Sequence, residues 1–251
     1  PREAYLSPMG DIVDAYGDGT LPYRTESTQR YYQFTTSNTA EYIFDLNRQH
    51  NFNILVGQES IYSKDEGFAT SREGLSDPRM LLLTNATEEP TVTQALSETV
   101  FNSVFAQAFY DYREKYFLSG SVRGDGSSRF PKKHRWAAFW SLGGRWNMLK
   151  ESFMSPTKGW LNQMDVKLSY GTTGNSSIGD YLYMGLASSQ GVQYDGEGGL
   201  LLSQQSIDDL TWESVGQMNL GVDLRIFNRL SVGLDYYVKN TTNMILSIPY
   251  S

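Results

Sequence analysis

The chain has 251 residues, of which 39% are hydrophobic, 20% charged and 14% aromatic, and it carries a net charge of −7 with no cysteine. This composition excludes a helical membrane protein and a disordered tail, and the acidic balance argues against nucleic acid as a partner. With no cysteine and only two histidines, His50 and His134, we expect neither a disulfide framework nor the usual zinc site. No cofactor is predicted.

Apolar side chains recur at every second position along most of the chain, which is the pattern of β-strands with one apolar face. The first predicted hairpin pairs Phe44 with Ile54 across a turn at residues 48–50. The second pairs Tyr110 with Leu118 across residues 113–115. Further strands are predicted over residues 31–37, 140–148, 164–170, 212–226 and 230–238.

The alternation of residues in the last predicted hairpin predicts the length of its turn. From Trp212 to Ile226 the even positions are mostly apolar and the odd positions mostly polar. Residues paired across a hairpin point to the same face, so Ile226 is expected to pair with Leu230. This pairing leaves a three-residue turn in which Asn228 or its neighbour takes the left-handed conformation. The three hairpins share this turn length, which indicates one antiparallel meander.

The predicted connections differ between the two ends of this meander. Turns at residues 48–50, 113–115, 149–163 and 227–229 fall at one end, and long connections over residues 64–99, 125–134 and 174–211 fall at the other. Long strands with this asymmetry are typical of a transmembrane outer-membrane β-barrel, with short periplasmic turns and long extracellular loops. A soluble β-sandwich has the same alternation and remains the alternative.

Aromatic residues of the apolar face lie beside the short turns. If that face meets lipid, they form an interfacial aromatic girdle, while Val222 points to lipid and Asp223 to the lumen. The predicted girdle residues are Tyr42, Tyr110, Tyr112, Tyr116 and Trp146. The polar residues predicted to face the lumen include Gln217, Asp223, Arg225, Asp235 and Lys239.

Residues 110–130, which read YDYREKYFLSGSVRGDGSSRF, resemble the SusC/RagA-like family of TonB-dependent outer-membrane receptors. Barrels of that family carry a similar Tyr-Asp-Tyr followed by Arg-x-Asp-Gly-Ser-Ser-Arg-Phe. Further matches follow in the family's order at residues 136–146, 168–175, 210–213, 219–224 and 235–237. The resemblance covers roughly residues 30–251. It departs at Glu114-Lys115, where the family has a different turn, and at Gly124, where an arginine is common.

The resemblance implies an all-β antiparallel meander that forms part of a barrel of about 22 strands in the cell outer membrane of a Gram-negative bacterium. Residues 1–251 are then one partial barrel domain, without the plug domain and the C-terminal closing strand. The implied function is TonB-dependent import of oligosaccharides or peptides, with no enzyme activity. The implied partners are outer-membrane lipid, a SusD-like surface lipoprotein and the TonB–ExbB–ExbD complex, which acts through the missing plug. The alternative function is that of a soluble carbohydrate-binding module.

Candidate chemistry elsewhere has simpler structural explanations. Arg123, Asp125 and Arg129 are expected to lock a hairpin loop with a turn at Asp125-Gly126, and both histidines are expected to be exposed. An outer-membrane enzyme would need an inward Ser-His-Asp arrangement that these histidines do not supply. No catalytic, cofactor-binding or metal residue is predicted, and substrate-binding residues stay unknown.

Several other groups resemble sites, and most of them are expected to be structural. The paired glycines do not fit a phosphate loop, the acids of the long loop lack a defined carboxylate pair, and the Asn-x-Ser/Thr sites fit polar loops. Aromatic residues of the connections are candidates for stacking on sugar rings. These groups comprise Gly143-Gly144, Gly198-Gly199, Asp195, Glu197, Asp208, Asp209, Glu213, Asn85, Asn175, Asn240, Tyr181, Tyr183, Tyr194 and Trp160.

Overall fold

The computed structural model describes residues 2–5, 23–75, 77, 79, 82–189, 193–194 and 197–246. These residues fall into two compact units. The first unit comprises Pro1–Phe34 and Tyr62–Thr99, and the second comprises Thr35–Ile61 and Val100–Ser251.

The main sheet has nine strands among the described residues, in the order β1-β2-β3-β4-β5-β6-β7-β12-β13. Neighbours in the sheet follow one another in the chain, except that the small strands β8 to β11 lie in the connection between β7 and β12. The predicted all-β antiparallel meander is therefore confirmed. The strands are β1 (Arg2–Tyr5), β2 (Tyr23–Leu46), β3 (His50–Glu73), β4 (Thr91–Tyr112), β5 (Tyr116–Ser127), β6 (Trp136–Asn147), β7 (Leu161–Asn175), β12 (Glu213–Ile226) and β13 (Leu230–Thr242).

The connections contain short elements. Two small antiparallel sheets pair β8 with β11 and β9 with β10, and four 3-10 helices occupy other connections. No helix in the described part of the chain is long and apolar enough to cross a membrane. The bounds are η1 (Leu83–Asn85), η2 (Lys132–His134), η3 (Met148–Lys150), η4 (Ser152–Thr157), β8 (Leu186–Ser188), β9 (Gln193–Tyr194), β10 (Glu197–Gly198) and β11 (Leu201–Gln204).

The first unit contains far more strand than the sequence predicts. β2 and β3 each have 24 residues, and β3 and β4 occupy much of the connection predicted over residues 64–99. The apolar alternation is weak here because polar side chains bond across the strands. Gln29 Nε2 donates to Asp65 Oδ2 at 2.9 Å, and the Tyr62 hydroxyl donates to Glu98 Oε1 at 3.0 Å. A search for apolar residues at every second position does not detect such strands.

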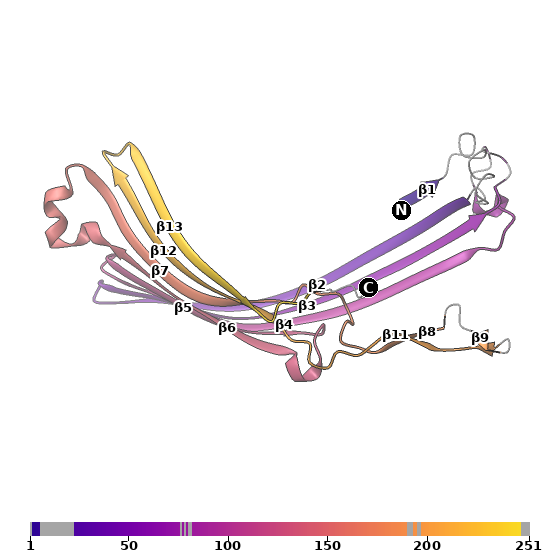
Figure 1. Ribbon diagram of the computed structural model, residues 1–251. Coiled ribbons are helices and arrows are strands. Elements are labelled where there is room, and N and C mark those ends of the chain that lie inside the picture. The colour runs from indigo at the N-terminus through magenta and orange to yellow at the C-terminus, as the bar shows by residue number, and fades with distance from the viewer. Residues whose placement is uncertain are drawn as a thin grey trace. The chain divides into compact units, whose positions relative to one another are not determined.

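In the second unit β5, β6, β7, β12 and β13 lie side by side (Figure 1). Ile226 is opposite Leu230 and Tyr112 is opposite Tyr116, which confirms two of the predicted three-residue turns. Phe227 and Asn228 have φ values of 51° and 55°, the left-handed conformation that such a turn needs.

The turn of the first hairpin lies one residue earlier in the chain than predicted, so the predicted register is wrong. The turn occupies residues 47–49 rather than 48–50, because Asn47 and Arg48 take the left-handed conformation, with φ of 55° and 56°. The ring of Phe44 consequently stacks on Phe52, with centroids 4.8 Å apart, instead of lying opposite Ile54. Moving the turn centre by one residue shifts each partner by two, so every side chain keeps its face.

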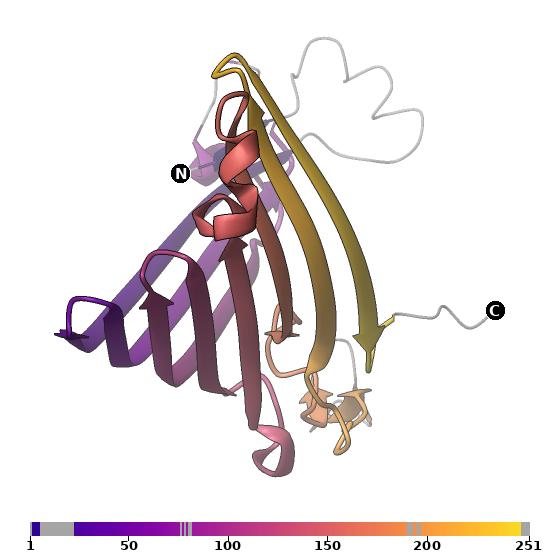
Figure 2. The same ribbon diagram turned by 90° about the vertical axis from the view of Figure 1, so that its left-hand side faces the viewer.

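A buried core in the second unit joins residues of the β5–β6 connection, β6 and the segment before β12. The ribbon places the β5–β6 and β7–β12 connections at the end of these strands opposite η3 and η4 (Figure 2). The indole of Trp212 stacks on Phe130, with ring centroids 4.7 Å apart, and meets the edge of Phe139 at 5.8 Å. Leu210 completes the cluster. Trp212 Nε1 also donates to the carbonyl oxygen of His134 at 3.1 Å. The segment that enters β12 is thereby fastened to the β5–β6 connection.

We expect Gly174→Ala to destabilise the full receptor by about 1–3 kcal/mol, because the added methyl would overlap the buried ring of Phe139. The urea midpoint in detergent measures this effect. Gly144→Ala is the matched control, since the nearest atom to its new methyl would be the Phe117 carbonyl oxygen at 3.8 Å. Equal midpoints for the two variants would contradict this packing.

Candidate functional site

The candidate site of this chain is a sheet with two chemically different faces, within the second unit. Even-numbered residues of β4 to β7, β12 and β13 share an apolar face, in which Leu220 is opposite Leu168 and Val222 is opposite both Val166 and Leu234. Its exposed members include Val104, Leu118, Val122, Trp140, Leu142, Leu168, Tyr170, Met218, Leu220, Leu234, Tyr236 and Val238. In the described part of the chain these side chains are exposed.

The opposite face is lined by polar side chains that bond to one another across strands. Ser121 and Ser141 hydroxyls lie 2.6 Å apart, and Asn219 Nδ2 donates to Ser169 Oγ at 3.3 Å. Lys167 Nζ forms an ion pair with Asp223 Oδ2. The predicted polar assignment of Asp223 thus agrees with its neighbours in the sheet.

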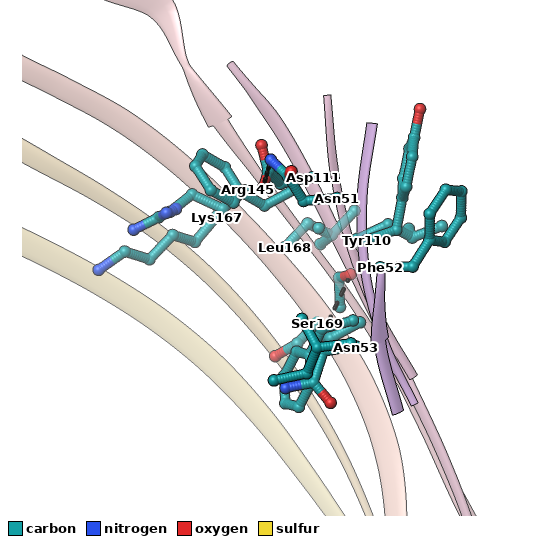
Figure 3. Close-up of a pocket in the computed structure, with 16 residues that line it drawn as sticks. Asn51, Phe52, Asn53, Tyr110, Asp111, Arg145, Lys167, Leu168 and Ser169 are labelled. Atoms are coloured by element: carbon teal, nitrogen blue, oxygen red, sulfur yellow. Dashed lines mark hydrogen bonds between the residues drawn. The ribbon is translucent and has the colours of Figure 1, made fainter. Parts of the chain in front are cut away.

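A close view of the second unit separates the two faces directly. Arg145 and Lys167 extend to one side of the strands, and Tyr110 and Phe52 extend to the other (Figure 3). The side chains of these strands therefore point to opposite faces, as the alternation of apolar and polar residues predicts.

The polar face contains a depression of about 540 Å³. Asn51 Nδ2 donates to Asp111 Oδ2 at 2.7 Å on one wall, and the Arg145 guanidinium lies 3.8 Å from the ring centroid of Phe117 on another. This wall offers amide, hydroxyl, carboxylate and cationic groups, with aromatic surface between them. These groups can form hydrogen bonds with a polar molecule.

Like charges face one another across two strand pairs of the polar face. Arg145 is directly opposite Lys167, and Asp165 is directly opposite Asp223. Like charges in such positions destabilise a sheet. The ion pair between Lys167 and Asp223 joins one member of each pair and offsets this repulsion. Gln163 Nε2 additionally donates to the buried Asp165 at 2.8 Å.

A chain of aromatic contacts runs beside the short turns and includes all five predicted girdle residues. Neighbouring rings have centroid separations between 4.8 and 6.4 Å. The sequence did not reveal that Phe153, from the β6–β7 connection, is the last ring in this series of aromatic contacts. The contacting rings are Tyr42, Phe44, Phe52, His50, Tyr110, Tyr112, Tyr116, Trp146 and Phe153.

Both histidine predictions are wrong in detail. His50 opens β3 instead of lying in a turn, and its half-buried ring places Nδ1 2.9 Å from the Tyr110 hydroxyl. His134 is half-buried in η2, where its carbonyl oxygen receives the Trp212 indole N–H. His50 was expected to be exposed because it was placed in a turn, and His134 because it lies beside Arg135. Contacts with Tyr110 and Tyr112 of β4, distant in sequence, cover the ring of His50 instead.

The carboxylate of Glu151, between η3 and η4, gathers three donors. The Tyr116 hydroxyl donates to Oε1 at 2.7 Å and Trp146 Nε1 donates to the same oxygen at 3.1 Å, while Lys115 Nζ lies 2.5 Å from Oε2. The hydrogen bond from Lys115, followed by that from Tyr116, holds the pKa of Glu151 below its usual range. Sequence reasoning missed this residue because it lies in an apparently irregular connection.

The Arg-Gly-Asp-Gly-Ser-Ser-Arg segment has the predicted locking role. Arg123 Nε donates to Asp125 Oδ1 at 2.6 Å, and Arg129 Nε donates to Asp180 Oδ1 at 2.7 Å. Ser128 exchanges two hydrogen bonds of 2.9 Å with the backbone of Val100. The bonds of Ser128 and Arg129 fix the β5–β6 connection, whereas the Arg123–Asp125 bond lies within β5.

The turn predicted at Asp125-Gly126 is wrong, because both residues lie inside β5. Gly126 is needed there for space rather than for a turn. A Cβ atom at this position would lie 2.7 Å from the Trp136 indole. The actual turn follows at Ser128 and Arg129.

The remaining candidates are scattered. Gly143 and Gly144 lie inside β6, Glu213 opens β12, and the exposed Asp209 lies 3.6 Å from Lys133. Asp195 lies outside the described residues, as do the side chains of Tyr194 and Glu197, and Gly198 ends β10. Gly199, Tyr181, Tyr183 and Asp208 occupy the β7–β12 connection, Trp160 follows η4, Asn85 lies in η1, Asn175 ends β7 and Asn240 lies in β13. Among the described side chains no His, Asp and Glu residues group as a metal site.

The chain was compared with known proteins, and residues 5–251 match the family "TonB dependent receptor-like, beta-barrel". The chain belongs to this family. It is 37% identical over 166 residues to TonB-dependent receptor P39 of Formosa agariphila, covering 66% of this chain and 15% of that protein. It is 27% identical over 247 residues to TonB-dependent receptor SusC of Bacteroides thetaiotaomicron, covering 93% of this chain and 24% of SusC.

A solved structure of the RagAB peptide transporter superposes with a TM-score of 0.85 at 31% identity, covering 92% of this chain and 26% of that one. The SusC/RagA-like resemblance is thus confirmed, and the chain is an outer-membrane protein whose meander corresponds to part of the receptor barrel. It spans about a quarter, or less, of the length of these relatives.

We expect Leu220→Arg to impair assembly of the full receptor, at a cost of about 2–4 kcal/mol if the position lies near the bilayer midplane. Asn219→Arg is the matched control, because its side chain belongs to the polar face. Asn219 is a cleaner control than Asp223, whose replacement would also remove the partner of Lys167. Assembly is measured by the heat-dependent change in gel migration of the receptor in the membrane fraction. Equal assembly of both variants would refute the assignment of Leu220 to the lipid-facing side of the sheet.

We expect the attachment made by Glu151 to weaken in acid. The folded-state pKa of Glu151 is lowered, so its stabilising contribution is present above the unfolded value of about 4.3 and is lost as pH falls through the folded value. Glu151→Gln should therefore lower the urea midpoint of the receptor at pH 7, with a smaller difference at pH 3. A difference that is the same at both pH values would contradict this linkage.

Proposed function

We propose that this chain forms part of the barrel wall of an outer-membrane importer for oligosaccharides or peptides. The observation that carries the proposal is the match to RagAB, described as a peptide transporter, over 92% of the chain. The SusC relationship supports the same class of receptor. In this proposal the importer performs no covalent chemistry, and its energy comes from the TonB–ExbB–ExbD complex.

We further propose that residues 1–251 belong to one barrel domain of a longer receptor, which supplies the plug domain and the closing strand from other parts of its chain. A SusD-like surface lipoprotein is the proposed partner at the extracellular end. The short turns then face the periplasm, and the long β7–β12 connection faces outward. The apolar face meets lipid, while the polar face with Arg145 and Lys167 lines the lumen.

The depression on the polar face combines apolar surface, such as Ile43, Phe109 and Phe117, with polar groups that cargo or the plug could contact. Its groups include the guanidinium of Arg145, the amides of Asn51 and Asn53, and the hydroxyl of Ser169. The exposed cations Arg145 and Lys167, with the amide and hydroxyl groups beside them, suit a path along which a hydrophilic molecule moves without being held tightly.

We expect a strain lacking the complete receptor gene to lose uptake of either fluorescent oligopeptides or fluorescent oligosaccharides. The complementing receptor should restore that uptake, and a protonophore should abolish it, because TonB transmits the energy of the inner membrane. Deleting the neighbouring lipoprotein gene, where one is encoded, should reduce uptake as well. Unchanged uptake of both probe classes in the deletion strain would refute the import proposal.

A further inference from the structure

The connection between β6 and β7 differs from the other connections at the same end of the sheet. Three of them are three-residue turns, whereas residues 148–160 form η3 and η4 before β7 begins. Antiparallel strands can be joined by two to five residues, so joining the strands does not require this length. The connection instead displays large apolar side chains. Phe153 is 58% exposed and Trp160 is 43% exposed.

This connection folds toward the apolar face rather than across the ends of the strands. Trp146 lies on that face, directly opposite Tyr116 and Val166. The ring of Phe153 meets the indole of Trp146 edge-on, with centroids 6.4 Å apart and an interplanar angle of 69°. Phe153 thus continues the chain of aromatic rings at the level of the predicted girdle.

Glu151 holds the connection in this position. Its side chain is only 12% exposed, and its carboxylate receives hydrogen bonds from Tyr116 and Trp146 and forms an ion pair with Lys115. A second ion pair links Lys150 to Glu114 in the neighbouring turn. Two ion pairs therefore attach the β6–β7 connection to the β4–β5 hairpin, while Phe153 of η4 remains exposed.

We propose that residues 148–160 form a lipid-binding anchor, in which Phe153 and Trp160 insert among phospholipid headgroups of the leaflet beside the short turns. Continuity with the aromatic girdle of a face that meets lipid supports a membrane as the occupant. Tryptophan and phenylalanine favour this interfacial depth, and the exposed Lys158 beside them suits anionic phosphate. The inference rests on the membrane orientation proposed above, and Glu151 is a positioning residue within it.

The test measures membrane depth with a spin label on the full-length receptor, freed of any other cysteine and reconstituted in phosphatidylethanolamine–phosphatidylglycerol vesicles. Labels are placed at Phe153→Cys, at Leu220→Cys on the apolar face, and at Asp209→Cys in the solvated loop. Collision with oxygen reports lipid, and collision with a water-soluble nickel complex reports the aqueous phase. We expect the label at residue 153 to be protected from nickel, and the label at residue 209 to be accessible.

The outcomes distinguish the anchor from the barrel orientation. A nickel-accessible label at residue 153 with a protected label at residue 220 would overturn the anchor and leave the proposed importer intact. Nickel access at both positions would overturn the orientation itself, and the anchor with it. Protection at both positions supports both.

The positioning role of Glu151 is tested on the labelled receptor. Glu151→Ala should raise nickel access at residue 153 several-fold while the barrel still shows heat-modifiable migration. Glu151→Gln, which retains an oxygen acceptor for Tyr116 and Trp146, should have a smaller effect. A label that stays equally protected in Glu151→Ala would show that the connection does not depend on this carboxylate.

Discussion

The alternation of side chains across a pleated strand is the constraint on which the rest of this structure depends. Consecutive residues of a strand point to opposite faces, and the cross-strand register decides whether neighbouring strands agree on which face is which. In the second unit they agree. Leu168, Leu220 and Leu234 share one face, whereas Lys167, Asn219 and Asp223 share the other. A lipid-compatible surface and a wet surface thus arise from the same backbone hydrogen bonds.

Sequence reasoning recovered the parts of the fold in which this constraint acts alone. The partners Ile226 and Leu230 follow from matching apolar faces, because only one turn parity is compatible with them. The turn before His50 was misplaced, since a shift of its centre by one residue leaves every face unchanged and so carries no signal in the alternation. The long strands β2 and β3 were underestimated because polar cross-strand bonds such as Gln29 with Asp65 replace apolar contacts there.

The candidate site was harder to anticipate, since its members meet only in three dimensions. Glu151 acquires its role from Lys115, Tyr116 and Trp146, which lie on other elements. The family motifs, by contrast, turned out to be structural. Arg129 fixes a loop through Asp180, and Phe130 packs on Trp212. Motifs that build a scaffold identify a family without indicating its cargo, which explains why the substrate is not legible in them.

The contact between Trp212 and the β5–β6 connection has a consequence for the order of events during folding. The hairpins of the second unit pair residues that are close in sequence, so each forms at little cost in chain entropy. The hydrogen bond from Trp212 to His134 instead joins residues 78 positions apart. Phe130 and Phe139 therefore gain their contacts with Leu210 and Trp212 only when the β7–β12 connection has arrived, and until then part of their apolar surface can associate with other apolar surfaces. A chaperone that shields nascent barrel strands would be needed longest at this point of the chain.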